Sequence, residues 1–592
     1  MNTNLKVNAL RAAMKAQKID AYLIPSGDPH QSEYVANHWK SRRWISGFSG
    51  SAGLVIVTQQ DAGLWTDSRY FIQAKEQLAG SEIVLQKQKI PHAPEHIEWL
   101  VSQLPSGSTV ACDGNVLSIS QIKSLESAFA KKNIKINATT DLISQIWENR
   151  PPMPSNQVFE HDLSYAGVSR VDKINQVRKK MIADYHLIST LDDIAWLLNL
   201  RSNDVNCNPV TIAFVIIGKE STLLFIDAQK VNAELAAILK RDKIELHPYD
   251  GVTSFLKNLP SDHRIQIHMG STNTRLYQAI APEQIVNGDN ITMRLKAIKN
   301  ETEKKHIHTA MIKDGIALTK LYLWLDTKLD EQTVSEVELA KQLANFRLQQ
   351  GDYHGESFGA IVGYKGNGAI VHYSAAPETC AQIEKDGILL LDSGGQYFCG
   401  TTDITRTITL GTPTTEQKRN FTLVLKGHIA IATLQFPHGT VGVQMDAFAR
   451  HHLWQHGLNY GHGTGHGVGF FLNVHEGPQG IASSITTSRG STVFEAGMFT
   501  SNEPGFYKTG EYGIRIENLV FTEVAGETEY GQFLKFETVT LFPIDLNLVE
   551  VSLLNEGEKT WLNDYHQKVF EKLSPHLEAD EVEWMRNQCR KI

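Results

Sequence analysis

This 592-residue chain has few cysteines, no long apolar run and no excess of positive charge. Its five cysteines are scattered without a CxxC pair, which argues against a disulfide framework and against a cysteine zinc site. The longest apolar runs, such as TIAFVIIG at 211–218, are much shorter than the ~20 residues that span a bilayer. Lysine and arginine number 57 against 65 acidic residues, a net charge of −8, so nucleic acid is not an expected partner.

The composition otherwise indicates an ordinary folded protein. Hydrophobic residues make up 41% and charged residues 21%, which gives little support to disorder or low-complexity sequence. The first residues are basic and amphipathic but lack the continuous apolar core and cleavage site of a signal peptide. We therefore expect a cytoplasmic protein that begins with a helix and does not interact with a membrane.

The length predicts several domains, and the sequence indicates where they divide. Three prolines in WENRPPMPSN at 147–156 mark a linker, because proline continues neither a helix nor a central strand. A long charged helix begins near residue 298 and leads into a region rich in Gly, His, Asp and Glu. These changes predict domains at 1–150, 151–297 and 298–592.

The first two predicted domains resemble each other. Both alternate helical and strand-like patterns, and LWTDSRYFIQAKEQL at 64–78 is similar to LLFIDAQKVNAELAAIL at 223–239. The sequence therefore predicts two related α/β domains in tandem. The last residues, from about 556, are predicted to form helices that cap the surface.

Two aspartates lie at the ends of predicted strands in the third domain. In LLLDSGGQYFCGTTDITRTITLG at 389–411, two strand-like runs flank a glycine-containing turn and bring Asp392 near Asp403. Aspartate is a poor strand former, and a shared divalent cation would neutralise the repulsion between the two. Taken alone, a turn cap and a surface position explain this pair at least as well.

Histidines are dense in the next motif. In YGHGTGHGVGFFLNVHEGP at 460–478, the glycines make a helix improbable, so the chain is expected to be extended, with His462 and His466 on one face. His475 follows nine residues later, and His372 in GAIVHYSA could add a fourth imidazole. Each histidine alone is more often structural than a ligand, but their density favours a site.

Two glutamates complete the candidate set. Glu503 precedes Pro504 and Gly505 at a predicted turn. Glu517 lies in a predicted strand, and the alternation of that strand places Arg515 and Glu517 on the same face. Several carboxylates with imidazole and no thiolate suit Mn²⁺, Co²⁺ or Zn²⁺ in a two-metal site, with Mn²⁺ the usual match. Such a pair activates water for hydrolysis of a carbonyl or phosphoryl bond. Other hydrolytic signatures, GxSxG and HExxH, are missing.

At these residues the sequence resembles aminopeptidase P, the Xaa-Pro aminopeptidase family of the pita-bread metallopeptidase fold, in its long three-domain cytosolic form. The contexts are LDSGG, TTDITRT, GTGHGVG, SNEPG and RIEN, and DPHQSEY, SGFSGSAG, WTDSRYF and FETVTLFP extend the resemblance over essentially the whole chain. The resemblance implies a pita-bread catalytic domain with a C-terminal helical extension, after two creatinase/prolidase-type domains. It also implies two divalent metal ions bound by Asp392, Asp403, His466, Glu503 and Glu517.

The resemblance further implies roles for the remaining site residues. Asp403 and Glu517 would bridge the two ions, Glu503 would also shuttle a proton, and His372 and His475 would stabilise the oxyanion and orient the peptide. The substrate-binding residues implied are Arg69, His372, His462 and His475. The expected substrates are peptides with proline second, and the expected assembly is a homodimer.

Two alternatives remain at this point. A prolidase shares the fold and ligands but cleaves only dipeptides; the two N-terminal domains and the GHGTGHGVG context favour aminopeptidase P. A metal-free pita-bread protein could instead bind peptides or proteins, since fold alone does not guarantee activity. All five ligand positions here keep side chains able to coordinate metal, which disfavours that alternative.

Overall fold

The computed structural model of the protein describes residues 2–89, 95–485 and 488–592. The chain forms two compact units. Met1–Leu163 and Val168–Met293 make the first, and Ser164–Gly167 and Arg294–Ile592 make the second. Within the described ranges, no helix combines the length and apolar character needed to cross a bilayer. All five cysteines lie in these ranges, and no disulfide joins any of them.

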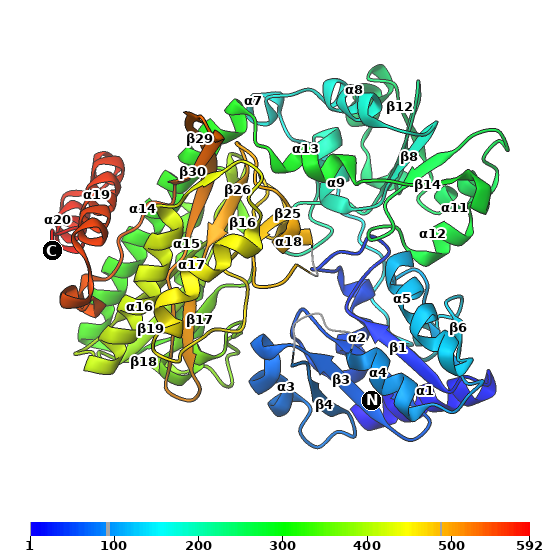
Figure 1. The fold of residues 1–592 in the computed structure, drawn as a ribbon, viewed down its shortest axis with the longest axis horizontal. Helices are drawn as coiled ribbons and strands as arrows, with labels where there is room; N and C mark the ends of the chain where they lie inside the picture. The colour runs from blue at the N-terminus through cyan, green and yellow to red at the C-terminus, as the bar shows by residue number, and fades with distance from the viewer. Residues whose placement is uncertain (1, 90–94, 486–487) are drawn as a thin grey trace. The chain divides into compact units, whose positions relative to one another are not determined.

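The first unit contains a six-stranded sheet built from the N-terminal part of the chain (Figure 1). Its strands, in spatial order, are β4 (Val84–Lys87), β3 (Ala62–Thr66), β2 (Leu54–Thr58), β1 (Ala21–Pro25), β5 (Thr109–Cys112) and β6 (Lys135–Asn137). The amphipathic helix α1 (Thr3–Ala16) buries Val7, Leu10 and Met14 in the core of this domain. The N-terminal stretch is therefore a structural helix of the first sheet domain, as predicted.

A second six-stranded sheet repeats the first. Its order is β12 (Ile244–His247), β11 (Thr222–Phe225), β10 (Phe214–Gly218), β8 (Tyr185–Ile188), β13 (Ile265–Ile267) and β14 (Ile285–Asn287). In the order given, the first pairing of each sheet is parallel, the second and third are antiparallel, and the last two are parallel. The identical order and direction confirm two related α/β domains in tandem.

Helices of the second unit flank its strands (Figure 1). They include α14 (Glu301–Glu331), α15 (Glu336–Leu348), α16 (Thr415–Ala432), α17 (Gly442–Trp454), α19 (Glu556–Leu573) and α20 (Ala579–Gln588). Helix α14 begins at a capping box. The side chains of Asn300 and Glu303 each accept a hydrogen bond from the other's backbone amide, which gives a partner to N–H groups that have none within the helix. The long charged helix predicted near residue 298 is thus confirmed.

Two sheets of the second unit carry the candidate site. The larger has the order β23 (Gln435–Pro437), β30 (Gly531–Thr538), β29 (Asn518–Thr528), β26 (Phe499–Asn502), β24 (Gly465–Gly467) and β25 (Glu476–Ile481). The smaller consists of β17 (Ile361–Tyr364), β19 (Ile388–Ser393) and β22 (Ile404–Thr409). A separate hairpin, β27 (Gly505–Lys508) with β28 (Tyr512–Arg515), lies between β26 and β29 in sequence.

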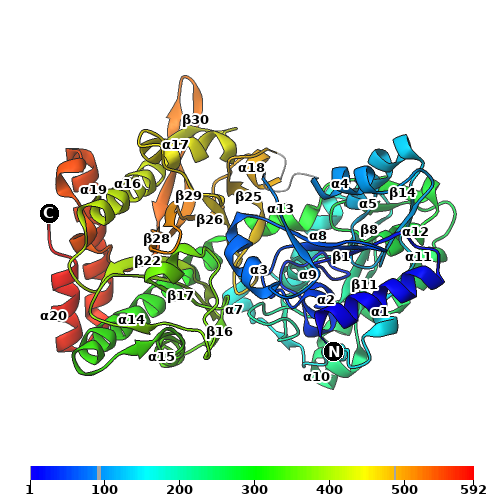
Figure 2. The same ribbon diagram turned by 90° about the horizontal axis from the view of Figure 1, so that it is seen from below.

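The C-terminal helices are more deeply integrated than a surface cap. Leu562, Tyr565 and Val569 of α19 belong to the main hydrophobic core of the unit, with Met585 of α20. The prediction that this tail forms helices is confirmed, but its apolar face contributes to the core. Figure 2 shows the β29–β30 hairpin projecting beyond the helices. Tyr530, between the two paired strands, is 80% exposed.

Candidate metal centre

Antiparallel pairing of β19 with β22 brings two aspartates to the same end of the small sheet. Asp392 is the fifth residue of β19 and pairs with Thr405, and Asp403 directly precedes β22. Both residues are buried, at 7% and 4% exposure. The predicted approach of the two aspartates therefore has a structural basis in strand register.

His466 lies at the centre of the short strand β24. Its Nε2 is 3.5 Å from Oδ2 of Asp403 and 3.5 Å from Oε1 of Glu503. Its Nδ1 is 2.9 Å from the carbonyl oxygen of Gly467. A carbonyl oxygen can only accept a hydrogen bond, so Nδ1 carries the proton and donates it. This hydrogen bond fixes the tautomer that leaves the Nε2 lone pair directed at the carboxylates, as metal-binding histidines require.

Glu503 and Glu517 approach from the large sheet. Glu503 follows β26, where its backbone amide donates to the carbonyl of Thr464 at 2.8 Å. Glu517 lies in the break between β28 and β29, where the sequence predicted a continuous strand. Its Oε2 accepts a hydrogen bond of 2.7 Å from the hydroxyl of Thr405. The break lets the Glu517 side chain leave the strand direction and reach the aspartates.

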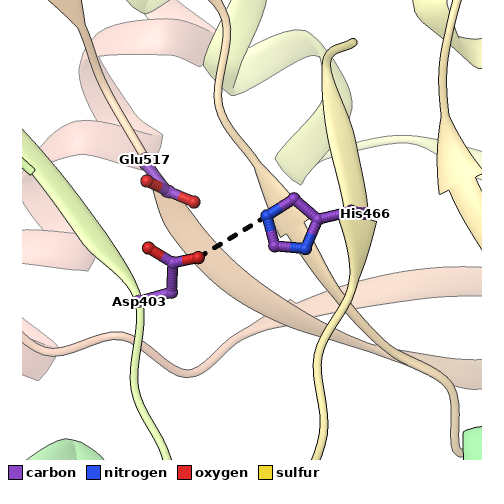
Figure 3. Close-up of side chains that lie close together, drawn as sticks. All are labelled: Asp403, His466 and Glu517. Carbon is purple, nitrogen blue, oxygen red and sulfur yellow. Dashed lines mark ion pairs between the residues drawn. The ribbon is translucent and has the colours of Figure 1, made fainter. Parts of the chain in front are cut away.

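Asp403, His466 and Glu517 form the tightest cluster. One ligand atom from each lies within 4.8 Å of the others, and Figure 3 shows the three side chains facing a common point. Asp392 adds a buried Oδ1 that accepts no hydrogen bond within the described residues. A buried carboxylate oxygen without a donor is costly, and an oxygen-seeking cation would satisfy it. The donor set therefore fits divalent metal ions.

The electrostatics point the same way. Burial, reinforced by the neighbouring acidic groups, holds the pKa values of Asp403 and Glu517 well above their usual range. Burial likewise raises the pKa of Glu503 to about 7, although the Arg515 guanidinium opposes the shift. Like charges packed this closely cannot all ionise without a counter-charge. Cations at this point would supply it.

Arg515 links Asp392 to His462, and the sequence did not assign it a role. Its Nη2 donates to Oδ2 of Asp392 at 2.5 Å, and its Nη1 donates to the hydroxyl of Tyr507 at 2.6 Å. That hydroxyl is in turn 2.8 Å from Nε2 of His462. Strand alternation had placed Arg515 on the face of Glu517, but it gave no sign of the partners.

The remaining predicted residues have different surroundings. The His475 ring lies 4.4 Å from the His466 ring at an edge-on angle of 74°. Nδ1 of His462 is 4.0 Å from Oε2 of Glu503. His372 is partly exposed in the loop after the 3₁₀ helix Lys365–Ala369. Arg69 belongs to the first unit, where its guanidinium forms a two-point ion pair with Asp67 at 2.8 Å.

The structure thus brings together the residues predicted as metal ligands. His462 and His475 border this cluster. The pairing of Arg69 with Asp67 is a structural interaction of the kind expected for an arginine in a strand-to-helix turn.

Comparison with family descriptions covers most of the chain. Residues 305–523 match metallopeptidase family M24, and residues 532–592 match the C-terminal region of that peptidase. Residues 6–146 and 149–303 each match the creatinase/prolidase N-terminal domain. The two matches to one domain description agree with the two sheets of identical topology.

Individual relatives are similar over nearly all of this chain and most of their own length. A probable Xaa-Pro aminopeptidase P of Laccaria bicolor is 42% identical, with 100% of this chain and 94% of the relative aligned. Aminopeptidase P2 of Arabidopsis thaliana is 40% identical over 97% of this chain and 86% of its own. A Caenorhabditis elegans X-prolyl aminopeptidase, described as a cytosolic enzyme with a di-nuclear active site, superposes with a TM-score of 0.96 at 32% identity over 100% of both chains.

These similarities confirm the predicted fold, two creatinase-type domains followed by a pita-bread domain, and they identify an enzyme. The carboxylate and imidazole cluster lies within the matched catalytic region. The chain belongs to the Xaa-Pro aminopeptidase P family of the M24 metallopeptidases.

Proposed function

We propose that this chain is a metal-dependent aminopeptidase that hydrolyses the bond between the first residue of a peptide and a proline in second position. The observation that carries the proposal is the convergence of Asp403, His466 and Glu517, with ligand atoms within 4.8 Å, in a chain similar to Xaa-Pro aminopeptidases along its full length. Family resemblance alone does not say which residues form the site. The cluster identifies carboxylate and imidazole groups that could bind metal ions there.

Five side chains would hold two divalent metal ions. Asp392, with its unsatisfied Oδ1, would bind one ion, Asp403 and Glu517 would bridge the pair, and His466 and Glu503 would bind the other. When bound, such a pair lowers the pKa of a shared water and stabilises negative charge that develops on the peptide oxygen. The carboxylate-rich set favours Mn²⁺, with Zn²⁺ and Co²⁺ as alternatives.

The protein's own groups would move the proton and orient the peptide. Glu503, whose Oε1 lies 3.5 Å from Nε2 of His466, would accept and return a proton during hydrolysis. His475 and His372 would donate hydrogen bonds to the oxyanion, and His462 would contact the substrate. The Arg515–Tyr507 pair would hold His462 and Asp392 in place.

Selectivity for proline has a simple physical basis. An Xaa-Pro bond is a tertiary amide without an N–H group, and the proline ring fixes φ. A peptidase that recognises that N–H therefore cannot bind it, and a dedicated site must accept the ring. The same proposal includes Arg69 as a substrate-side residue, a cytoplasmic location and a homodimer.

Release of the first residue from a tripeptide separates this proposal from a dipeptidase. With purified protein and Mn²⁺, we expect arginine release from Arg-Pro-Pro, and no release from Arg-Ala-Ala as the matched control. Hydrolysis confined to dipeptides such as Arg-Pro would identify a prolidase instead. Binding of Arg-Pro-Pro without hydrolysis would favour a binding module.

The oligomeric state can be measured by light scattering on the same sample, for which the proposal expects twice the chain mass.

A further inference from the structure

A buried ionic cluster lies beside the candidate site, and none of the roles above uses it. Nζ of Lys299 is 2.6 Å from Oε1 of Glu476, and Nζ of Lys296 is 3.0 Å from Oε2. The two lysine side chains are 1% exposed and the glutamate is fully buried. Nζ of Lys299 also donates to the carbonyl oxygen of Lys296 at 2.9 Å. We call these three residues the lysine clamp.

The lysine clamp ties two parts of the second unit together. On one side, the backbone amide of Lys299 donates to the carbonyl of Gly497 at 2.9 Å, and Ile298 bridges Met498 just before β26. On the other side, Glu476 is the first residue of β25 and pairs with Gly467 of β24. Both carboxylate oxygens are therefore fixed at the point where β25 begins.

His475 directly precedes Glu476. Its ring packs edge-on against the ring of His466, with centroids 4.4 Å apart. The direction of that ring depends on the backbone at the start of β25, because the Cα–Cβ bond is set by the local φ and ψ. Fixing the neighbouring carboxylate at both oxygens therefore fixes the approach of His475.

Energetics also favour a positioning role over a stabilising one. Burying two ammonium groups and a carboxylate costs several kcal/mol per ion in desolvation, and apolar replacements of such clusters are often as stable. A cluster of this kind is best explained by the geometry that it specifies.

We propose that Lys296, Lys299 and Glu476 are positioning residues that hold His475 in its reactive orientation. The inference rests on the proposed aminopeptidase function and deepens it. The orientation of the peptide at the scissile bond would depend on three charged side chains that touch neither metal nor substrate. It predicts that weakening the lysine clamp lowers kcat through His475.

A double-mutant cycle tests this coupling. Glu476→Gln keeps the side-chain volume but removes the charge, and we expect kcat for Arg-Pro-Pro to fall about tenfold or more, as for other supporting groups around metal sites. The KM and the metal content should stay near wild type. In the His475→Ala background, the same Glu476→Gln change should lower kcat no further, because its effect passes through the missing ring. Independent, multiplying effects on kcat would overturn the proposal.

Two further variants keep the test decisive. Lys299→Met removes one of the two ammonium groups and leaves Glu476 paired with Lys296, so it provides the same cycle if Glu476→Gln does not fold. Glu558→Gln is the matched control, because it breaks the Lys426–Glu558 ion pair, 2.6 Å long, between α16 and α19, which carry no site residue. The control should lower Tm without changing kcat. An equal loss of kcat in the control would mean that the effect is general destabilisation.

A crystal structure of Glu476→Gln separates failure of this inference from failure of the proposed function. We expect the His475 ring to leave its edge-on contact with His466 in the variant, whatever the peptide specificity of the wild type. Absence of Xaa-Pro cleavage by the wild type would refute the function. An unmoved His475 ring would refute the lysine clamp.

Discussion

Four carboxylates and one imidazole meet in a space that has little compensating positive charge of its own. Arg515 reaches Asp392 directly and Glu517 only through the hydroxyl of Thr405, from Nε at 3.1 Å. Asp403 receives no comparable contact from the guanidinium, and its pKa is held well above the usual range by burial and by Glu517. The charge of Asp403 thus depends on a bound cation rather than on Arg515.

Removal of Asp403 should therefore abolish activity and metal binding together. We expect Asp403→Ala to lower kcat/KM for Arg-Pro-Pro below about one-hundredth, beyond the loss typical of outer-shell residues, and to lower the metal content per chain. Metal analysis by mass spectrometry alongside the assay measures both. Asp386→Ala, at an exposed aspartate, is the control and should match the wild type. Full activity of Asp403→Ala would exclude a bridging role.

The cluster of candidate ligand residues could be proposed from sequence, whereas the place of Arg515 beside it could not. Each ligand stands in a short motif whose glycine, proline or strand context is visible locally. The contact of Arg515 with Asp392 joins positions 123 residues apart, and its contact with Tyr507 crosses a hairpin. Only the packed sheets determine which of the arginines reaches the site.

At the level of elements, alternation predicted strands well but not where they break. The runs around Asp392 and Asp403 do form the paired strands β19 and β22. The chain predicted to be extended around His462 and His466 is a strand only at Gly465–Gly467, and Glu517 falls between two strands. Such breaks arise where a side chain is directed into a site, and the demands of the site override the local pattern.

The loop that carries His372 is anchored by one buried carboxylate. Glu336, at the start of α15, accepts hydrogen bonds from the backbone amides of Tyr364 and Ala381, at 2.9 and 2.8 Å, and from the hydroxyl of Tyr373 at 2.8 Å. Asn367 donates to the same carboxylate at 3.0 and 3.2 Å. Tyr373 is the immediate neighbour of His372, so the loop depends on Glu336.

Loss of this carboxylate should destabilise the loop. We expect Glu336→Ala to lower the free energy of unfolding by about 3 kcal/mol, because several buried donors lose their acceptor. Urea titration of the purified variant measures the change. Glu338→Ala, an exposed glutamate on the same helix, should change stability by less than about 0.5 kcal/mol. Equal stability of the two variants would contradict the anchoring role.

At the scale of the whole molecule, internal similarity in the sequence was enough to predict the duplicated sheets. Segments 64–78 and 223–239, noted as alike, correspond to β3 with α3 (Phe71–Gln77) and to β11 with α10 (Ala233–Arg241). These segments occupy the same place in two sheets of equal order. The depth to which α19 and α20 enter the core was not predictable, because their polar composition suggested a surface role.

Acid should destabilise the second unit through two buried histidines. Burial, with a contribution from nearby Arg406, lowers the pKa of both His428 and His566 to about 3. Between about pH 6.5 and 3, these histidines are protonated in the unfolded chain but stay neutral in the native state. The free energy of unfolding therefore decreases as the pH is lowered, by up to about 1.4 kcal/mol per pH unit for each histidine. The stability due to each neutral ring is complete above pH 6.5.

His566→Gln tests this slope, since its amide can still accept the hydrogen bond of 3.0 Å from the Ile544 amide but does not titrate. In chelator-treated protein, urea titrations from pH 7 to 4 should show a shallower loss of stability for the variant than for the wild type. Identical slopes would mean that His566 is not a source of the acid sensitivity.

Removal and return of the metal ions tests the central claim most directly. Wild-type protein is dialysed against a chelator, assayed for arginine release from Arg-Pro-Pro, and assayed again after Mn²⁺ is added. We expect activity to disappear with the ions and to return when about two Mn²⁺ per chain are bound, as a two-metal site requires. Undiminished cleavage by the metal-free protein would contradict the account.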